Sequence, residues 1–74
     1  MGIGIQPEPR MYTKIITAAT GEADPAKIAR MKDYMRNVIF HSTLDWQTAA
    51  QLKRAAKTAA RELPMLDAIM GRAA

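Results

Sequence analysis

Hydrophobic residues recur along the middle of this chain with the period of an α-helix. Over residues 25–40, apolar side chains fall at spacings of three and four, which places them on one face of a helix. These positions are Ile28, Met31, Met35, Val38 and Ile39. Asp24 and Pro25 mark the start of this helix. The Asp24 carboxylate can accept hydrogen bonds from the free amides of the first turn. Proline is suited to the first helical position, where the N–H that it lacks would have no partner within the helix. The pattern predicts a helix over 25–40.

A second helical pattern follows a break at residues 41–47, where residues typical of caps and turns are dense. Thr48 and Gln51 have the spacing of a capping box, in which each side chain bonds the other residue's amide. The apolar face behind this box consists of Leu52, Ala56, Ala59 and Leu63. We expect Pro64 to end or kink this helix. The sequence therefore predicts a helix over 48–63 that forms an antiparallel hairpin with the first helix.

Two shorter segments flank the predicted hairpin. Residues 9–20 have a wide apolar stripe at helical spacing, with Pro9 suited to the first turn and Gly21 to the position after the end. Residues 11–17 are rich in β-branched side chains, so a strand is the alternative for that segment. Residues 64–70 form a further short amphipathic helix.

The length of 74 residues is that of one domain. A domain this small buries only about 60% of the surface that its unfolded chain exposes, so its margin of stability is narrow. The chain has no cysteine and a single histidine, which excludes disulfides and thiolate metal sites and argues against zinc. Helix packing, or association with another chain, must supply the stability instead.

The fold class that follows is all-α. We expect a small bundle of three to four short helices, centred on the helical hairpin and contained in residues 9–74. Residues 1–8, with Gly2 and Gly4 between their apolar side chains and Pro7 near the end, are expected to form a flexible or partner-bound arm.

No residue pattern indicates catalysis. The chain has no glycine-rich phosphate loop and no carboxylate pair placed for acid–base chemistry. His41, Ser42 and Asp45 lie together on the predicted turn, where they serve as capping residues, and no oxyanion site accompanies them. We therefore expect no enzyme, no cofactor, no metal ion and no small-molecule substrate.

Trp46 is the only tryptophan, and it lies beside Leu44 in the loop of the hairpin. Tryptophan is enriched in binding hot spots, and loops often carry function. Leu44 and Trp46 are therefore candidate contacts for another protein. The alternative, which a small alanine-lined core favours, is that Trp46 folds over that core as a plug.

The last predicted helix carries four large apolar side chains within six residues. They are Met65, Leu66, Ile69 and Met70. A segment this apolar must be covered by its own domain, by a second copy or by another protein, and methionine suits adaptable recognition. These four residues are the second group of candidate protein contacts, and a homo-oligomer is expected.

The helix over 48–63 also carries a basic face. It consists of Lys53, Arg54, Lys57 and Arg61, and the chain as a whole has a net charge of +4. Such a face suits a phosphate backbone, although an ordinary solvated face is the simpler interpretation. The face has no Asn or Gln to read adenine, so any nucleic-acid binding is expected to be independent of sequence.

No apolar run approaches the roughly 18–20 residues of a membrane span, and the N-terminus lacks the pattern of a secretory signal. The absence of cysteine fits a reducing cytoplasm. Residues 39–48 resemble segments of small phage and mobile-element proteins, which implies an inhibitor of a host protein. We therefore expect a protein-interaction or regulatory module, acting as an oligomer, with a sequence-nonspecific nucleic-acid binder as the alternative.

Overall fold

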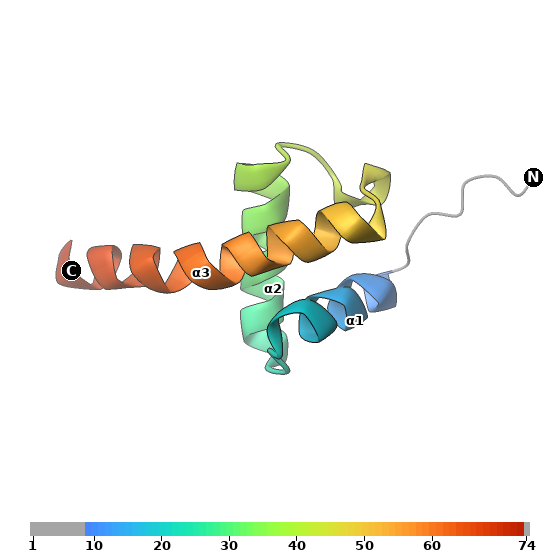
Figure 1. Cartoon of the computed structure of the whole chain (residues 1–74). Coiled ribbons are helices and arrows are strands. Elements are labelled where there is room, and N and C mark those ends of the chain that lie inside the picture. The colour runs from blue at the N-terminus through green and yellow to red at the C-terminus, as the bar shows by residue number, and fades with distance from the viewer. Residues whose placement is uncertain (1–8, 74) are drawn as a thin grey trace, which may run out of the picture.

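A computed structural model of the chain describes the backbone of residues 9–73 and the side chains of residues 11–71. The elements are α1 (Pro9–Thr20), α2 (Pro25–Tyr34), the π-helical turn η1 (Met35–Ile39), the 3-10 turn η2 (Leu44–Trp46) and α3 (Ala49–Ala73). Figure 1 shows α1 lying alongside the first half of α3, while α2 crosses behind α3 and contacts both helices. The predicted all-α class is confirmed. The predicted arm at residues 1–8 lies outside the described residues.

Helix α1 has the predicted bounds, so the strand alternative for residues 11–17 is wrong. Tyr12 and Ile16 are buried, at 8% and 0% exposure, because helical spacing puts both on the face that meets α3. This burial outweighs the modest strand preference of the β-branched residues. Gly21 ends the helix at φ +80°, and its N–H donates to the Thr17 carbonyl at 2.7 Å.

Helix α2 begins as predicted, because the Ala26 N–H donates to the Asp24 carboxylate at 3.0 Å. The helix then widens: the Phe40 N–H donates to the Met35 carbonyl at 2.8 Å, five residues back. The wider turn changes the register of the side chains after Met35. Val38, expected on the buried face, is therefore 49% exposed, and that part of the prediction is wrong.

The wide turn ends at His41, a non-glycine residue with φ +54°. Helices often end on a left-handed residue, which is usually glycine because a Cβ is strained there. The Ser42 N–H donates to the Arg36 carbonyl at 3.0 Å, which gives a partner to one of the last carbonyls of this wide turn.

Helix α3 begins with the predicted capping box: the Thr48 N–H donates to the Gln51 side chain at 2.8 Å, and the Gln51 N–H donates to Thr48 at 3.2 Å. It then continues through Pro64 to Ala73. The predicted end at 63 and the separate helix at 64–70 are therefore wrong. Proline removes one backbone donor, and its ring crowds the carbonyl of the residue four positions back, which here is Ala60.

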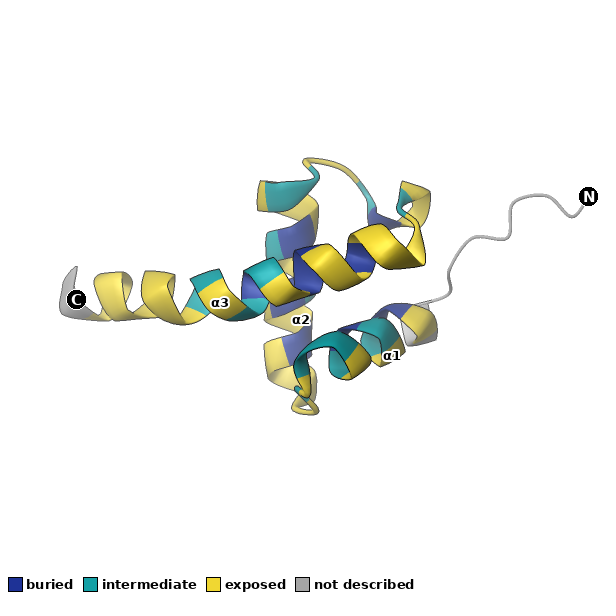
Figure 2. Cartoon of the chain, viewed as in Figure 1, coloured by how far each residue is buried: buried dark blue, intermediate teal, exposed yellow. Residues whose placement is uncertain are grey.

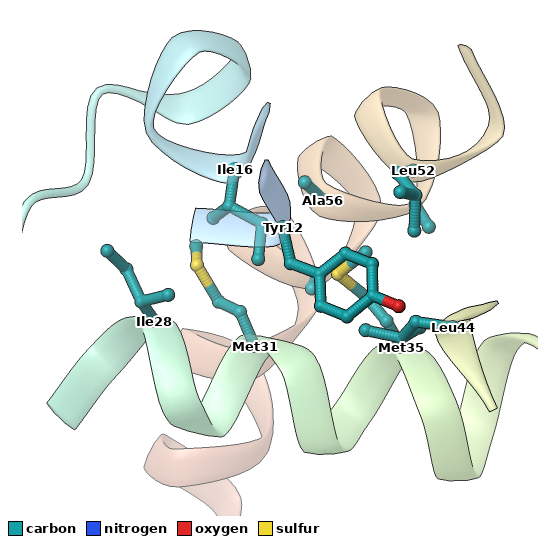
Figure 3. Packing of buried hydrophobic residues seen from close by; sticks show 10 residues of the cluster. Tyr12, Ile16, Ile28, Met31, Met35, Leu44, Leu52 and Ala56 are labelled. Carbon is teal, nitrogen blue, oxygen red and sulfur yellow. The ribbon is translucent and has the colours of Figure 1, made fainter. Parts of the chain in front are cut away.

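The core lies where α1, α2 and the first half of α3 meet (Figure 3). Its largest fully buried side chains are Ile16, Met35 and Leu52. The other buried residues of α3 have small side chains, which allow the helices to approach closely: Ala55, Ala56 and Ala59. No described residue beyond Ala59 is buried, so the second half of α3 contributes little to the core.

Candidate functional site

The second half of α3 projects beyond the rest of the bundle (Figure 1), and the molecule measures 51 × 24 × 18 Å along its principal axes. Figure 2 shows this half as mostly exposed. It carries the four apolar residues singled out from the sequence, Met65 (61% exposed), Leu66 (39%), Ile69 (61%) and Met70 (68%). Because they are three and four residues apart or adjacent, they form one stripe. We call these four residues the terminal stripe.

Two members of the terminal stripe, Leu66 and Met70, continue the face of α3 that packs on the core, whereas Met65 and Ile69 lie to one side of that face. Apolar residues on this face alternate at spacings of four and three: Leu52, Ala56, Ala59, Leu63, Leu66 and Met70. The first three are buried, Leu63 is half-buried, and the last two are exposed. Spacing of this kind is the seam by which one helix packs against another. Helices α1 and α2 cover the first part of the seam, and no described residue covers the second.

An ion pair holds the projecting half of α3 against α2. The Arg30 guanidinium donates to the two carboxylate oxygens of Asp67 at 2.7 and 2.6 Å. These hydrogen bonds lower the pKa of Asp67 and raise that of Arg30. Both side chains are about half exposed, so the pair adds little to overall stability. Its two-point geometry links the projecting half of α3 to α2.

A second contact between the same helices involves Tyr34 and Glu62. The Tyr34 hydroxyl donates to the Glu62 carboxylate, and this bond raises the pKa of Tyr34. The sequence missed both contacts, because their partners lie 28 and 37 residues apart and meet only through the crossing of α2 and α3.

Trp46 is held on the outside of the fold. It is 71% exposed, whereas Leu44, two residues earlier in η2, is 3% exposed. In a 3-10 turn successive side chains point about a third of a turn apart, so Leu44 and Trp46 face different directions. The interpretation of Trp46 as a plug is therefore wrong, and so is the assignment of Leu44 as a surface contact. Leu44 fills the position over the core that was expected for Trp46.

Asp45, between these two residues, anchors η2 to α1. The Tyr12 hydroxyl donates to the Asp45 carboxylate. Burial, and then this bond to an anion, raise the pKa of Tyr12 to about 12. The Asp45 N–H also donates to the Thr43 hydroxyl at 3.3 Å. Asp45 is thus occupied in fixing the loop, rather than in orienting His41 for catalysis.

The basic face is present on α3, and its members Lys53, Arg54, Lys57 and Arg61 are all exposed. Helical spacing places them opposite the buried seam, on the outer side of α3. Among the described residues none of the four forms an ion pair. Glu62, the acidic residue nearest to Arg61 in sequence, is directed to Tyr34 instead.

A hollow of about 350 Å³ lies between the start of α2 and the middle of α3. Its lining includes two carboxylates, those of Glu22 and Asp67. Glu22 accepts hydrogen bonds from the amides of Ala23 and Asp24 at 3.1 and 3.0 Å, and Asp67 is paired with Arg30. Both carboxylates therefore have structural roles. In the described part of the chain, no group of three or more His, Asp or Glu side chains is placed to hold a metal ion.

Among residues 9–73, no helix is long and apolar enough to cross a bilayer. Comparison of the chain with known protein families, with curated proteins and with solved structures finds no match. The terminal stripe, Trp46 and the basic face are therefore the observations on which a functional proposal rests.

Proposed function

We propose that this chain is a small protein-interaction module, regulatory in effect, whose docking surface is the terminal stripe. One observation carries the proposal: four large apolar side chains are exposed together on a helix that projects beyond its own core. The largest exposed apolar patch on a protein is often a binding surface.

The chemistry of the stripe fits recognition between helices. Its residues occupy one side of a helix, as in complexes where an amphipathic helix lies in an apolar groove. Two of its members, Met65 and Met70, have unbranched side chains that adapt to irregular surfaces. The Arg30–Asp67 pair orients the helix in advance, which reduces the ordering that binding must impose.

Trp46 supplies a second contact in this proposal. An indole that is 71% exposed provides a large rigid surface, and tryptophan is among the residues most enriched in binding hot spots. A module of this size acts by occupying the surface of its partner, and inhibition of a host protein is one form of such action. We place that action in the cytoplasm, since a chain without cysteine suits a reducing compartment.

The proposal is tested with matched variants of exposed apolar residues. Ile69→Asp puts a charge in the terminal stripe, and Val38→Asp puts the same charge at an exposed apolar position on η1. In affinity capture from host extract, a protein that binds the stripe must be retained by wild type and by Val38→Asp and lost with Ile69→Asp. Equal capture by all three chains would contradict the proposal.

The basic face supports a second candidate function, sequence-independent binding of nucleic acid. Its four cations are exposed and unpaired among the described residues, and such cations displace counterions from phosphates. Binding to labelled DNA and RNA, followed by fluorescence anisotropy, should then weaken steeply as salt rises. Lys57→Gln with Arg61→Gln should weaken binding further. If the double variant binds as wild type does, this candidate is eliminated.

A further inference from the structure

We infer that the partner of the terminal stripe is a second copy of this chain, and that the two α3 helices pair antiparallel along their projecting halves. The inference rests on the proposed function in that it uses the same docking surface. It adds the identity of the partner and the geometry of the complex.

The seam of α3 indicates that the occupant is a helix. Its alternating spacing of four and three is continuous from the buried part to Leu66 and Met70, and this spacing packs against helices. In the buried part the seam is covered by helices of its own chain. The projecting half of α3 in a second copy presents the same seam, so it offers a surface of matching shape and polarity.

The charges near the terminal stripe favour pairing between copies. Asp67 is the only charged residue between Met65 and Met70, and it is neutralised by Arg30. The basic face lies on the first half of α3 and on its outer side. Two copies with a net charge of +4 each can therefore meet along their stripes without placing unpaired cations in contact.

The area of the stripe sets the strength of the pairing. The exposed fractions of its four side chains, 39–68%, correspond to roughly 400 Å² per copy, the size of the largest apolar patches on monomers. Stable complexes bury about 800 Å² per partner. Pairing through the stripe therefore predicts a weak dimer that forms as the protein concentration rises and dissociates as it falls.

The position of α2 determines the direction of the pairing. Helix α2 crosses α3 beside Glu62 and Asp67, at the start of the projecting half (Figure 1). A parallel pair would bring the two α2 helices to the same end, where they compete for space. An antiparallel pair puts the two bundles at opposite ends. Leu66 then lies opposite Met70 of the second copy, because these are the two residues of the terminal stripe that belong to the seam.

Sedimentation equilibrium tests the self-association. Wild type and Val38→Asp should change from monomer to dimer as concentration rises, whereas Ile69→Asp should dissociate at least about tenfold more readily, because the twofold axis introduces the charge twice. Helix content by circular dichroism checks that each variant is folded. A wild type that stays monomeric up to millimolar concentration overturns the inference, as does an Ile69→Asp chain that dimerises like wild type.

Single cysteines test the direction of pairing without background, because the chain has none of its own. Leu66→Cys and Met70→Cys, both on the seam, are prepared separately, mixed and oxidised gently. Antiparallel pairing predicts disulfides mainly between the two variants in the mixture and few within either variant alone. Disulfides mainly within each variant alone would indicate parallel pairing and overturn the geometry. The two proposals can fail separately. If the wild-type chain stays monomeric and a protein that it captures is lost with Ile69→Asp, the partner is not a second copy but the proposed function stands.

Discussion

Arg30 on α2 and Asp67 on α3 are joined by two hydrogen bonds of 2.7 and 2.6 Å, one helical turn beyond Pro64. Proline cannot donate the backbone hydrogen bond that would tie this turn of α3 to Ala60. The side-chain pair therefore connects the projecting half to the bundle at the place where the helix's own hydrogen bonding is interrupted.

Replacing Arg30 with Gln should loosen the projecting half without unfolding the bundle. The core contains no residue beyond Ala59 among those described, so the loss of the pair acts locally. Amide hydrogen exchange should become severalfold faster at residues 65–71 and stay unchanged in α1. Lys32→Gln, which removes a cation from α2 that is outside the pair, is the matched control. Equal effects of the two variants would contradict this role for the pair.

The same pair makes the projecting half sensitive to acid. Hydrogen bonds from Arg30 hold the pKa of Asp67 below its ordinary value. The stabilisation is therefore present above the ordinary pKa of an aspartate and is lost as pH falls through the lowered pKa of the folded state. Exchange at residues 65–71, corrected for its intrinsic pH dependence, should rise in acid for wild type. In Arg30→Gln this rise should be much smaller.

Leu44 and Trp46 should respond differently to truncation. Leu44→Ala empties a buried position and should lower the free energy of unfolding by about 2–5 kcal/mol. Trp46→Ala removes a mostly exposed side chain and should change it by less than about 0.5 kcal/mol. Urea denaturation followed by circular dichroism measures both. A loss of more than about 2 kcal/mol for Trp46→Ala would restore the interpretation of Trp46 as a plug.

Tyr12 should make the fold sensitive to alkali. Its pKa is raised to about 12 in the folded chain, by burial and by the bond to Asp45, whereas an unfolded tyrosine ionises near pH ~10. The stabilisation is therefore complete below that pH and is lost as pH rises towards 12. The loss of stability in this interval should be smaller in Tyr12→Phe than in wild type, as measured by urea denaturation at each pH. An identical alkaline slope in the two chains would contradict the assignment.

His41→Gly should stabilise the chain. The residue adopts φ +54°, which costs a side chain with a Cβ roughly 1–2 kcal/mol and glycine almost nothing. Part of this gain is offset by the greater freedom of glycine in the unfolded state, so we expect a net gain of up to about 1 kcal/mol. Thermal denaturation measures the change, with His41→Ala as the control that keeps the strain. A destabilised glycine variant would show that the His41 side chain makes a contact that matters.

The features that the sequence predicted are those set by neighbouring residues. The Asp24 cap, the Thr48–Gln51 box and the glycine end at Gly21 each depend on residues within four positions of one another. The hydrogen bonds of these caps join residues that are close in sequence, so they need no tertiary contact. For the same reason the starts of α1, α2 and α3 were predictable to within one residue.

The features that the sequence did not predict depend on distant contacts. Whether Leu44 or Trp46 covers the core depends on the anchoring of Asp45 by Tyr12, 33 residues away. The passage of α3 through Pro64 is accompanied by a contact with Arg30, which is equally remote in sequence. The candidate site was predictable in part: the sequence singled out the four residues of the terminal stripe but left open whether their own domain covers them, and their exposure and the direction in which they project are visible only in the structure.

The separation between the core and the projecting half of α3 has a consequence for how this protein can change over time. The buried residues end at Ala59, whereas the terminal stripe begins at Met65. Under the proposed function, substitutions in the stripe would alter what the helix recognises and leave the packing that folds the chain untouched. A lineage carrying this domain can thus acquire new specificity in the space of six residues without a loss of stability that further mutations would have to restore.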